Sequence, residues 1–157
     1  MLQDFSLEVP AGQTVALVGR SGSGKSTIVA LLQKLYHADS GTILVDDTDI
    51  EELESDHLRS QIAAVDQEPR LFNTTLEKNI AYGAGNEGQP GKDRIESAAQ
   101  MASVDEFLPN LAEGYDTDVG ELGGRLSGGQ RQRVAIARAL IRHERIKVGP
   151  GVQGRWL

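Results

Sequence analysis

The sequence predicts an α/β fold in which a mixed or parallel sheet is joined to a mostly helical region. Two short, β-rich apolar runs, Thr14 to Val18 and Ile62 to Val65, have the length and composition of buried strands. The first run leads through a glycine-rich loop into a helical pattern that continues to about Tyr36. After Ser127, the stretch GGQRQRVAIARALIR places apolar residues in one stripe at helical spacing.

The other elements are predicted from alternation, periodicity and turn residues. Phe5, Leu7 and Val9 alternate with polar residues before the turn at Pro10 to Gly12, which predicts an opening strand. The glycine-rich stretch Gly83 to Gly91 is expected to form a mobile loop. The patterns also predict a strand at Thr42 to Val45 and helices at Ser55 to Ser60, Leu76 to Tyr82, Arg94 to Ala102 and Asp105 to Leu111.

Composition narrows the possible functions. The chain has 157 residues, 39% of them apolar, which is enough for one core. A formal net charge of -7 argues against a nucleic-acid-binding face. The absence of cysteine excludes disulfides and thiolate metal sites, and it makes an intracellular setting the default expectation. No apolar run approaches the roughly 20 residues of a membrane span, and the first residues do not form a signal peptide. Membrane association would therefore come through a partner or through sequence outside this chain.

Residues 19 to 27, GRSGSGKST, fit the phosphate-loop pattern G-x-x-x-x-G-K-[ST] between a strand and a helix. Glycines let the backbone N–H groups wrap closely around phosphate oxygens, and the following helix directs the positive end of its dipole at them. Lys25 would follow the β- and γ-phosphates, and Ser26 would bind Mg²⁺. Thr27 is explained equally well as a helix cap, and an ordinary glycine-rich turn is the alternative for the whole loop. The predicted nucleotide-binding residues here are Gly19, Ser21, Gly22, Ser23, Gly24, Lys25, Ser26 and Thr27.

A second motif, LSGGQ at Leu126 to Gln130, precedes the string RQRVAIARAL. Ser127 and two glycines at a helix start offer a hydroxyl, bare N–H groups and a dipole end, although a plain serine cap would use the same residues. A phosphate loop alone leaves kinases, GTPases and motor ATPases open. The LSGGQ string resembles the signature motif of the ATP-binding cassette (ABC) transporter family, which implies a P-loop NTPase core with a helical signature subdomain. By this resemblance Leu126, Ser127, Gly128, Gly129 and Gln130 also bind nucleotide.

The resemblance covers residues 1 to about 143 and is strongest to exporter domains. Gln67 in VDQEPRLF is similar to the glutamine-loop residue, which implies a catalytic role near the attacking water and, with Ser26, contact with Mg²⁺. The strings NIAYG and TDVGELG resemble stretches near the transmembrane coupling helices. The implied cofactors are ATP and Mg²⁺. The implied partners are a second such domain, arranged head to tail, and transmembrane domains that hold the chain at the cytosolic face of a membrane; no nucleic acid is implied.

A DNA-repair or chromosome-structure ATPase with a related signature is the other family considered. The exporter-like strings and the short separation of the two motifs disfavour it. On the resemblance, residues 1–143 form the domain, with a phosphate-loop core at 1–74 and a helical subdomain at 75–143. His37, His57 and His143 are interpreted as surface residues, and Asp47 and Asp66 stand where the family usually has a turn glycine and a small residue.

Departures from the family pattern concern the end of the chain. The family continues from the signature helix into an apolar strand that ends in Asp and Glu, whereas here Ile146 and Val148 flank Lys147 and a Gly-Pro-Gly sequence follows. We therefore expect a domain incomplete at its C-terminus, a gap in the sheet, marginal stability and a divergent tail at 144–157. Enzymatic activity stays open between three hypotheses: an ATPase completed from elsewhere, a nucleotide-binding module without hydrolysis, and an inert fragment.

Overall fold

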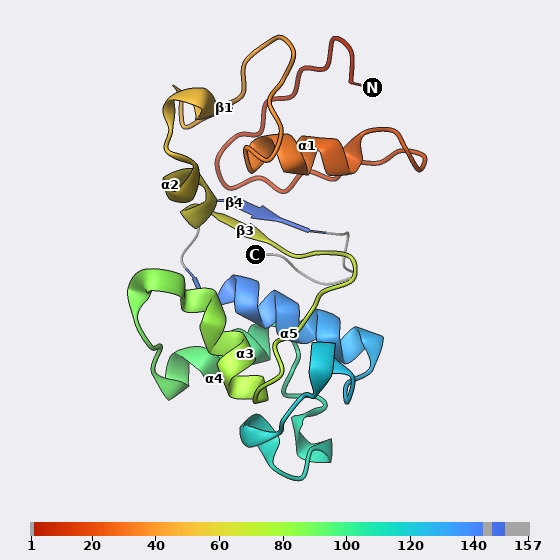
Figure 1. The fold of residues 1–157 in the computed structure, drawn as a ribbon, viewed down its shortest axis with the longest axis vertical. Helices are drawn as coiled ribbons and strands as arrows, with labels where there is room; N and C mark the ends of the chain where they lie inside the picture. Colours follow the sequence, from red (N-terminus) through yellow and green to blue (C-terminus); the bar gives the residue numbers. More distant parts are fainter. Residues whose placement is uncertain (1, 143–145, 150–157) are drawn as a thin grey trace. The chain divides into compact units, whose positions relative to one another are not determined.

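The computed structural model describes residues 2–142 and 146–149, which form two compact units, 2–62 and 63–149 (Figure 1). The division that we predict at residues 74 and 75 stays a prediction. Among the described residues no helix combines the length and apolar character that a membrane crossing requires. The helices and strands are α1 (Lys25–Leu32), β1 (Leu44–Val45), β2 (Thr48–Asp49), α2 (Ser55–Ser60), β3 (Ile62–Ala64), α3 (Leu76–Ala81), α4 (Lys92–Met101), α5 (Gly128–Leu140) and β4 (Ile146–Val148).

Unit 1 begins with an extended segment that carries no assigned strand, so the strands predicted at residues 5–9 and 14–18 are wrong for this structure. Phe5, Leu7 and Val9 are each about half exposed, and Val18 is 93% exposed. A strand forms only where a neighbouring backbone completes its hydrogen-bond ladder, and none does so here among the described residues. The turn prediction is confirmed, because Gln13 N–H donates to the Pro10 carbonyl at 3.2 Å.

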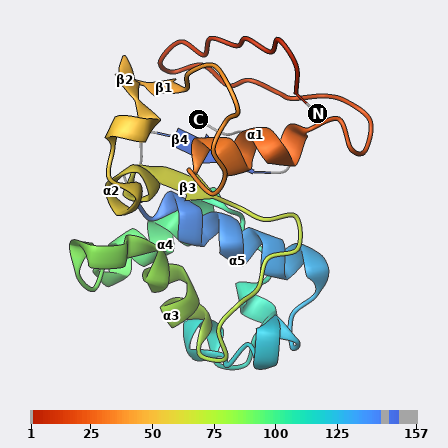
Figure 2. The same ribbon diagram turned by 45° about the horizontal axis from the view of Figure 1, so that its top comes forward.

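Helix α1 ends at Leu32, four residues before the predicted end, and none of its side chains is fully buried. The hairpin β1–β2 and a 3-10 turn at Ile50–Glu52 follow (Figure 2). In that turn the Asp49 carboxylate accepts from the Glu51 N–H at 2.9 Å, and Ile50 is 2% exposed. Helix α2 has the predicted bounds, and it buries Leu58.

The loop of the hairpin is two residues long, and both residues are aspartates with positive φ. Val45 pairs with Thr48, and Asp46 and Asp47 have φ of 48° and 63°. Left-handed conformation at both central positions defines a type I′ turn, which matches strand twist but favours Asn-Gly or Asp-Gly. Asp47 thus occupies the position at which the turn prefers glycine, as the sequence comparison with the family suggested.

Replacement of Asp47 by glycine should stabilise the protein. Glycine adopts the left-handed region without the Cβ contact that strains other residues, so Asp47→Gly should raise the unfolding free energy by about 1 kcal/mol. Urea denaturation followed by circular dichroism measures the change. Asp39→Gly, at a position without positive φ, is the matched control and should lower stability slightly; equal effects of the two changes would contradict the turn assignment.

In unit 2, helices α3, α4 and α5 pack side by side, and each contributes buried apolar residues to one core (Figures 1 and 2). Helix α4 is confirmed within two residues of the prediction, and α5 begins directly after Ser127 as expected. The residues of this core that are at most 2% exposed are Leu76, Asn79, Ile80, Ala84, Ile95, Ala98, Ala99, Val104, Val119, Val134, Ala137 and Ile141.

Two predicted elements of unit 2 differ from the structure. The helix predicted at residues 105–111 is only a 3-10 turn at Leu108–Asn110, because Pro109 would be the fifth residue of that helix and has no N–H to donate to the carbonyl of Asp105. The loop predicted at residues 83–91 begins as a 3-10 helix, Tyr82–Glu87, in which Ala84 is buried. Gly83 makes this packing possible, since a Cβ there would lie 1.8 Å from the Arg138 carbonyl oxygen of α5.

A side chain at Gly83 should therefore destabilise the helical unit. Gly83→Ala forces the 3-10 segment away from α5, and overpacking of this kind costs about 1–3 kcal/mol. The thermal unfolding midpoint should fall accordingly. Gly129→Ala, in α5 with no heavy atom within 4 Å of the added Cβ, is the control and should leave the midpoint unchanged or raise it. Equal midpoints for both variants would overturn the packing argument.

A short strand does follow α5. Ile146–Val148 forms β4, which pairs with β3, and the Val65 N–H donates to the Val148 carbonyl at 2.9 Å. The gap that we expected in the sheet after the signature helix is thus corrected beside β3, because two β-branched residues suffice to complete a ladder with that strand. Within the predicted tail, residues 144, 145 and 150–157 lie outside the described residues.

Candidate nucleotide-binding site

The phosphate loop of unit 1 depends on two glycines in left-handed conformation. Gly22 has φ of 81° and Gly24 has φ of 94°, and between them the Ser23 N–H donates to the Arg20 carbonyl at 3.2 Å. The alternation of left-handed and ordinary residues turns successive N–H groups toward one concave side, an arrangement that suits anions. Because other residues are strained at these two φ values, the glycines predicted for this loop are required by its backbone.

Lys25 lies over the loop that precedes it. Its Nζ atom donates to the carbonyls of Gly19 and Arg20 at 2.7 and 2.9 Å, and to the Ser23 hydroxyl at 3.3 Å. Three oxygen atoms of the loop thus hold the ammonium group against the backbone that precedes α1.

Helix α1 starts at Lys25, and its N-cap residue Gly24 makes no side-chain cap hydrogen bond. The first N–H groups of a helix have no partner within the helix, and the positive end of the dipole adds to their attraction for anions. Gly24 is buried beneath Leu2, whose Cδ2 would lie 2.8 Å from an added Cβ. Of the remaining predicted residues, Ser21 and Ser26 are exposed, whereas Thr27 is half-buried.

The signature segment in unit 2 forms a capping box at the start of α5. The Ser127 hydroxyl accepts from the Gln130 N–H at 3.3 Å, and the Gln130 side-chain oxygen accepts from the Ser127 N–H at 2.8 Å. Gly128 and Gly129 are exposed between them. Leu126 differs from its neighbours because its side chain is 4% exposed, and its carbonyl accepts from Arg131 at 2.7 Å. Leu126 therefore anchors the motif through its buried side chain, and its predicted contact with nucleotide stays a prediction.

Loss of the Ser127 hydroxyl should weaken the helix start. Ser127→Ala removes the acceptor for the Gln130 N–H, and the loss of an N-cap costs about 1 kcal/mol. Chemical denaturation should show this decrease in unfolding free energy. Ser127→Asp, which can still cap, is the control and should retain most of the stability; an unchanged Ser127→Ala variant would show that the cap does not contribute.

Gln67 is exposed in a bend that follows β3 in unit 2. The catalytic role of Gln67 and its contact with a metal ion stay predictions. Of the three histidines, His37 and His57 are exposed, as expected, and His143 lies outside the described residues. Within the described part of the chain no group of three or more histidine, aspartate or glutamate side chains could hold a metal ion.

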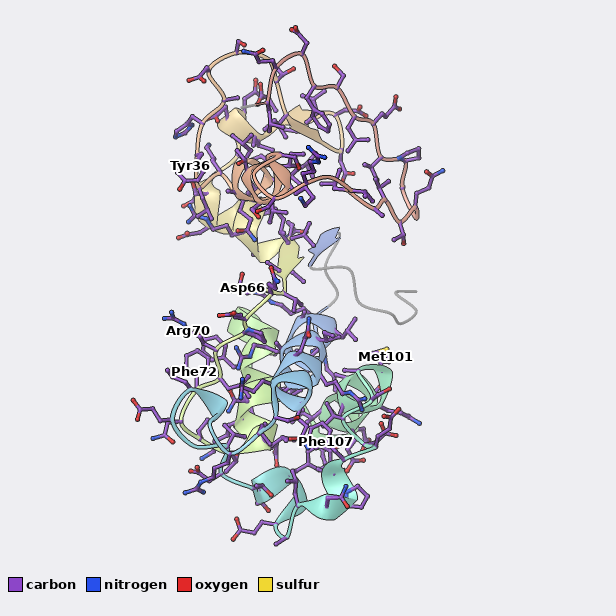
Figure 3. The ribbon with its side chains drawn as sticks, turned by 90° about the vertical axis from the view of Figure 1, so that its right-hand side faces the viewer. Tyr36, Asp66, Arg70, Phe72, Met101 and Phe107 are labelled. Atoms are coloured by element: carbon purple, nitrogen blue, oxygen red, sulfur yellow. The ribbon has the colours of Figure 1, made fainter. Side chains whose placement is uncertain are left out.

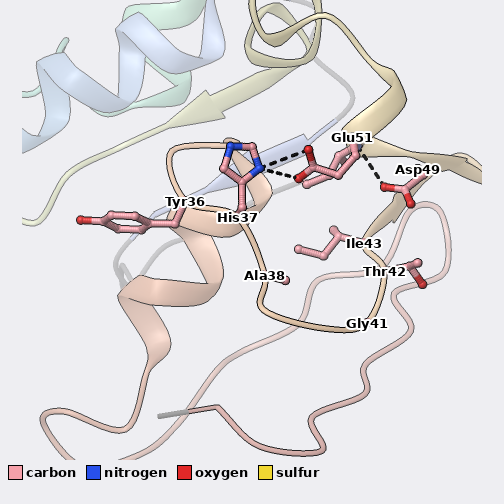
Figure 4. Close-up of a pocket in the computed structure, with 9 residues that line it drawn as sticks. Tyr36, His37, Ala38, Gly41, Thr42, Ile43, Asp49 and Glu51 are labelled. Atoms are coloured by element: carbon pink, nitrogen blue, oxygen red, sulfur yellow. Dashed lines mark hydrogen bonds and ion pairs between the residues drawn. The ribbon is translucent and has the colours of Figure 1, made fainter.

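The cavity in unit 1 lies apart from the phosphate loop in sequence. It has a volume of about 250 Å³ and lies between the segment that follows α1 and the 3-10 turn at Ile50–Glu52 (Figure 4). The His37 Nδ1 atom lies 3.0 and 3.2 Å from the two Glu51 carboxylate oxygens. The His37 side chain is 71% exposed, and solvent screens this pair.

Two arginines of α5 that the sequence analysis did not single out connect the helix to its surroundings. Arg133 pairs with Glu106 and donates to the Ser103 carbonyl at 2.9 Å. The hydrogen bond from Arg133 lowers the pKa of Glu106 below its usual value. Arg138 reaches across to the residues before and within α3. Both arginines stand in the string RQRVAIARAL, whose helical periodicity could have indicated that they leave α5 toward neighbouring segments.

The glycine-dependent loop before α1 and the capped signature at α5 define the class of protein as a P-loop nucleotide-binding domain. A family model described as "ABC transporter" matches residues 2–148. The chain therefore belongs to the ABC transporter family. It is an exporter-type nucleotide-binding domain with the α/β P-loop NTPase fold and a helical signature region, as the sequence predicted.

Similar proteins include exporters and flippases from distant organisms. The chain is 51% identical over 146 residues to mitochondrial ATP-binding cassette sub-family B member 10 of Mus musculus, which covers 93% of the chain and 20% of that protein. It is 52% identical over 147 residues to the ATP-dependent lipid A-core flippase of Methylococcus capsulatus, and the match covers 94% of this chain and 24% of the flippase.

A solved structure of a bacterial Atm1-family ABC exporter with ATP bound superposes with a TM-score of 0.85 at 45% identity. It covers 91% of this chain and 24% of the exporter chain. The chain thus spans about a fifth to a quarter of the length of these relatives.

Proposed function

We propose that this domain binds ATP with Mg²⁺ through residues 19–27. The observation that carries the proposal is the position of the Lys25 ammonium group, held at 2.7 and 2.9 Å by two carbonyls of a loop that needs left-handed glycines. Lys25 and the N–H groups at the start of α1 would bind the phosphates, while Ser26 would contribute a hydroxyl to the ion. The relative solved with ATP bound supports this choice of nucleotide.

We further propose that the signature of this chain completes the nucleotide site of a partner domain, which is a second copy or a related domain arranged head to tail with this one. Residues 127–130 would then close on the nucleotide held by the partner's phosphate loop, and two-fold symmetry would make both sites from one interface. The exposed glycines and the dipole end of α5 support a phosphate-facing role. Leu126 would position the motif from the core.

In the whole protein, ATP-driven closure would be passed to transmembrane domains, which would hold this domain at the cytosolic face. The exporter and flippase names of the relatives support an export role. We assign the transmembrane contact to the helical unit, where the Phe72 and Tyr82 side chains are 46% and 64% exposed. Figure 3 shows Phe72 and Arg70 on one side of this unit and Met101 on the other.

Hydrolysis would need a group that activates water, and Gln67 is the candidate in this chain. A specific observation favours binding without hydrolysis as the second candidate function: residues 146–149 read Ile-Lys-Val-Gly, so that no carboxylate lies on β4 or directly after it. Loss of a catalytic acid or base typically removes two to four decades of rate. Nucleotide binding by residues 19–27 does not depend on such a group.

Titration of the purified chain with a fluorescent ATP analogue and Mg²⁺ tests the proposal. Lys25→Ala should weaken binding by about 10- to 100-fold, the usual value of hydrogen bonds from one charged group. Lys92→Ala is the control, because it removes the same charge from an exposed position of the helical unit. Chelation of Mg²⁺ should also weaken binding. Equal affinities of the wild type and Lys25→Ala, or no saturable binding by either, would refute the function.

A further inference from the structure

We propose that Arg138 is a positioning residue that fixes the exposed pair Phe72 and Tyr82 to α5, the helix that begins with the signature. The inference rests on the proposed role of this pair in contacting the transmembrane partner. It adds a residue that touches neither nucleotide nor partner, yet determines how the signature helix and the aromatic pair are connected.

The two rings form one surface feature. Their centroids are 4.4 Å apart and their planes are inclined by 52°. Phe72 belongs to the segment before α3, whereas Tyr82 follows the last residue of α3. Because the two exposed rings contact each other, the shape of this surface feature depends on the groups that support both rings from beneath.

Asn79 provides the backbone part of that support. Its side chain is buried, accepts from the Phe72 N–H at 2.9 Å, and donates to the carbonyls of Phe72 and Thr75 at 3.0 and 3.1 Å. This amide therefore pairs with both the N–H and the carbonyl of Phe72, as the backbone of a neighbouring strand would. The position of Phe72 depends on where α3 places Asn79.

Arg138 connects this arrangement to α5 through three hydrogen bonds. Its Nε donates to the Asn79 carbonyl at 3.0 Å, Nη2 to the Asn79 side-chain oxygen at 2.6 Å, and Nη1 to the Arg70 carbonyl at 3.1 Å. The guanidinium carbon also lies 5.1 Å from the Phe72 ring centroid and 5.9 Å from that of Tyr82. A planar, forked cation can make these contacts at once, whereas lysine cannot.

The charge of Arg138 is bound without a carboxylate among the described residues, since its contacts there are carbonyl and amide oxygens and ring faces. Such a half-buried cation is costly unless each N–H is satisfied, so the site favours one arrangement of α5 against the two rings. The Arg138 carbonyl also lies against Gly83, where an added Cβ would meet it. Arg138 is thus held between both segments that carry the aromatic pair.

Fluorine NMR of the full chain labelled with 3-fluorotyrosine tests the proposal. The chain has three tyrosines, 36, 82 and 115, and Tyr82→Phe assigns the Tyr82 signal. Arg138→Gln should shift the Tyr82 signal toward the value of a solvated ring, and Arg138→Lys should not restore it. Signals of Tyr36 and Tyr115 should stay in place. Arg133→Gln, which removes an arginine from the same helix, should leave Tyr82 unchanged.

The proposal is overturned if Arg138→Gln keeps the Tyr82 signal of the wild type, or if Arg138→Lys restores it. If the Arg138 variants do not fold, NMR of the unsubstituted chain tests the proposal. The Arg138 Nε–H should be protected from exchange and should show Overhauser contacts to both rings. Absence of these signals refutes the proposal. The ATP analogue should bind Arg138→Lys as it binds the wild type. If the wild type binds no nucleotide, the proposed function fails, while the fluorine result still tests the position of Tyr82.

Discussion

The helical unit depends on one close approach, that of the 3-10 segment after α3 to the backbone of α5. Gly83 allows this approach because its missing Cβ leaves room for the Arg138 carbonyl, and the Arg138 side chain donates to the Asn79 carbonyl in the preceding helix α3. The buried amide of Asn79 then transmits that position to Phe72. The packing of the segment, the hydrogen bonds of the buried polar groups and the position of the exposed rings therefore depend on one another. A change at Gly83, Arg138 or Asn79 affects the other two.

The two units differ in how firmly their apolar residues are packed. In unit 2 the core residues of α3, α4 and α5 are almost fully buried, whereas α1 in unit 1 has no buried side chain and Phe5, Leu7 and Val9 remain half exposed. The phosphate loop is held instead by local means: left-handed glycines, a covering contact from Leu2 and hydrogen bonds from Lys25. Local backbone geometry can thus define the conformation of this loop without a large core beneath it.

Sequence reasoning was most successful where a motif specifies its own backbone. The start of α1 at Lys25, the start of α5 after Ser127 and the bounds of α2 depend on contacts within a few residues, and each of these predictions is confirmed. It failed where the outcome depends on distant partners. The alternating residues 5–9 predict a strand only if another strand lies beside them, and the 3-10 segment at Gly83 owes its conformation to Arg138, which lies 55 positions later in the sequence. Periodicity alone cannot reveal such pairings.

The capping box has a consequence for the way the signature could meet a phosphate. A serine hydroxyl has two lone pairs and one proton, and the cap uses only a lone pair. The Ser127 proton is left for an acceptor in front of the helix, and the Gln130 amide likewise keeps both of its protons, because its oxygen makes the cap. An arriving anion would therefore find donor protons that the cap does not use, and α5 would not have to uncoil its first turn in order to bind it.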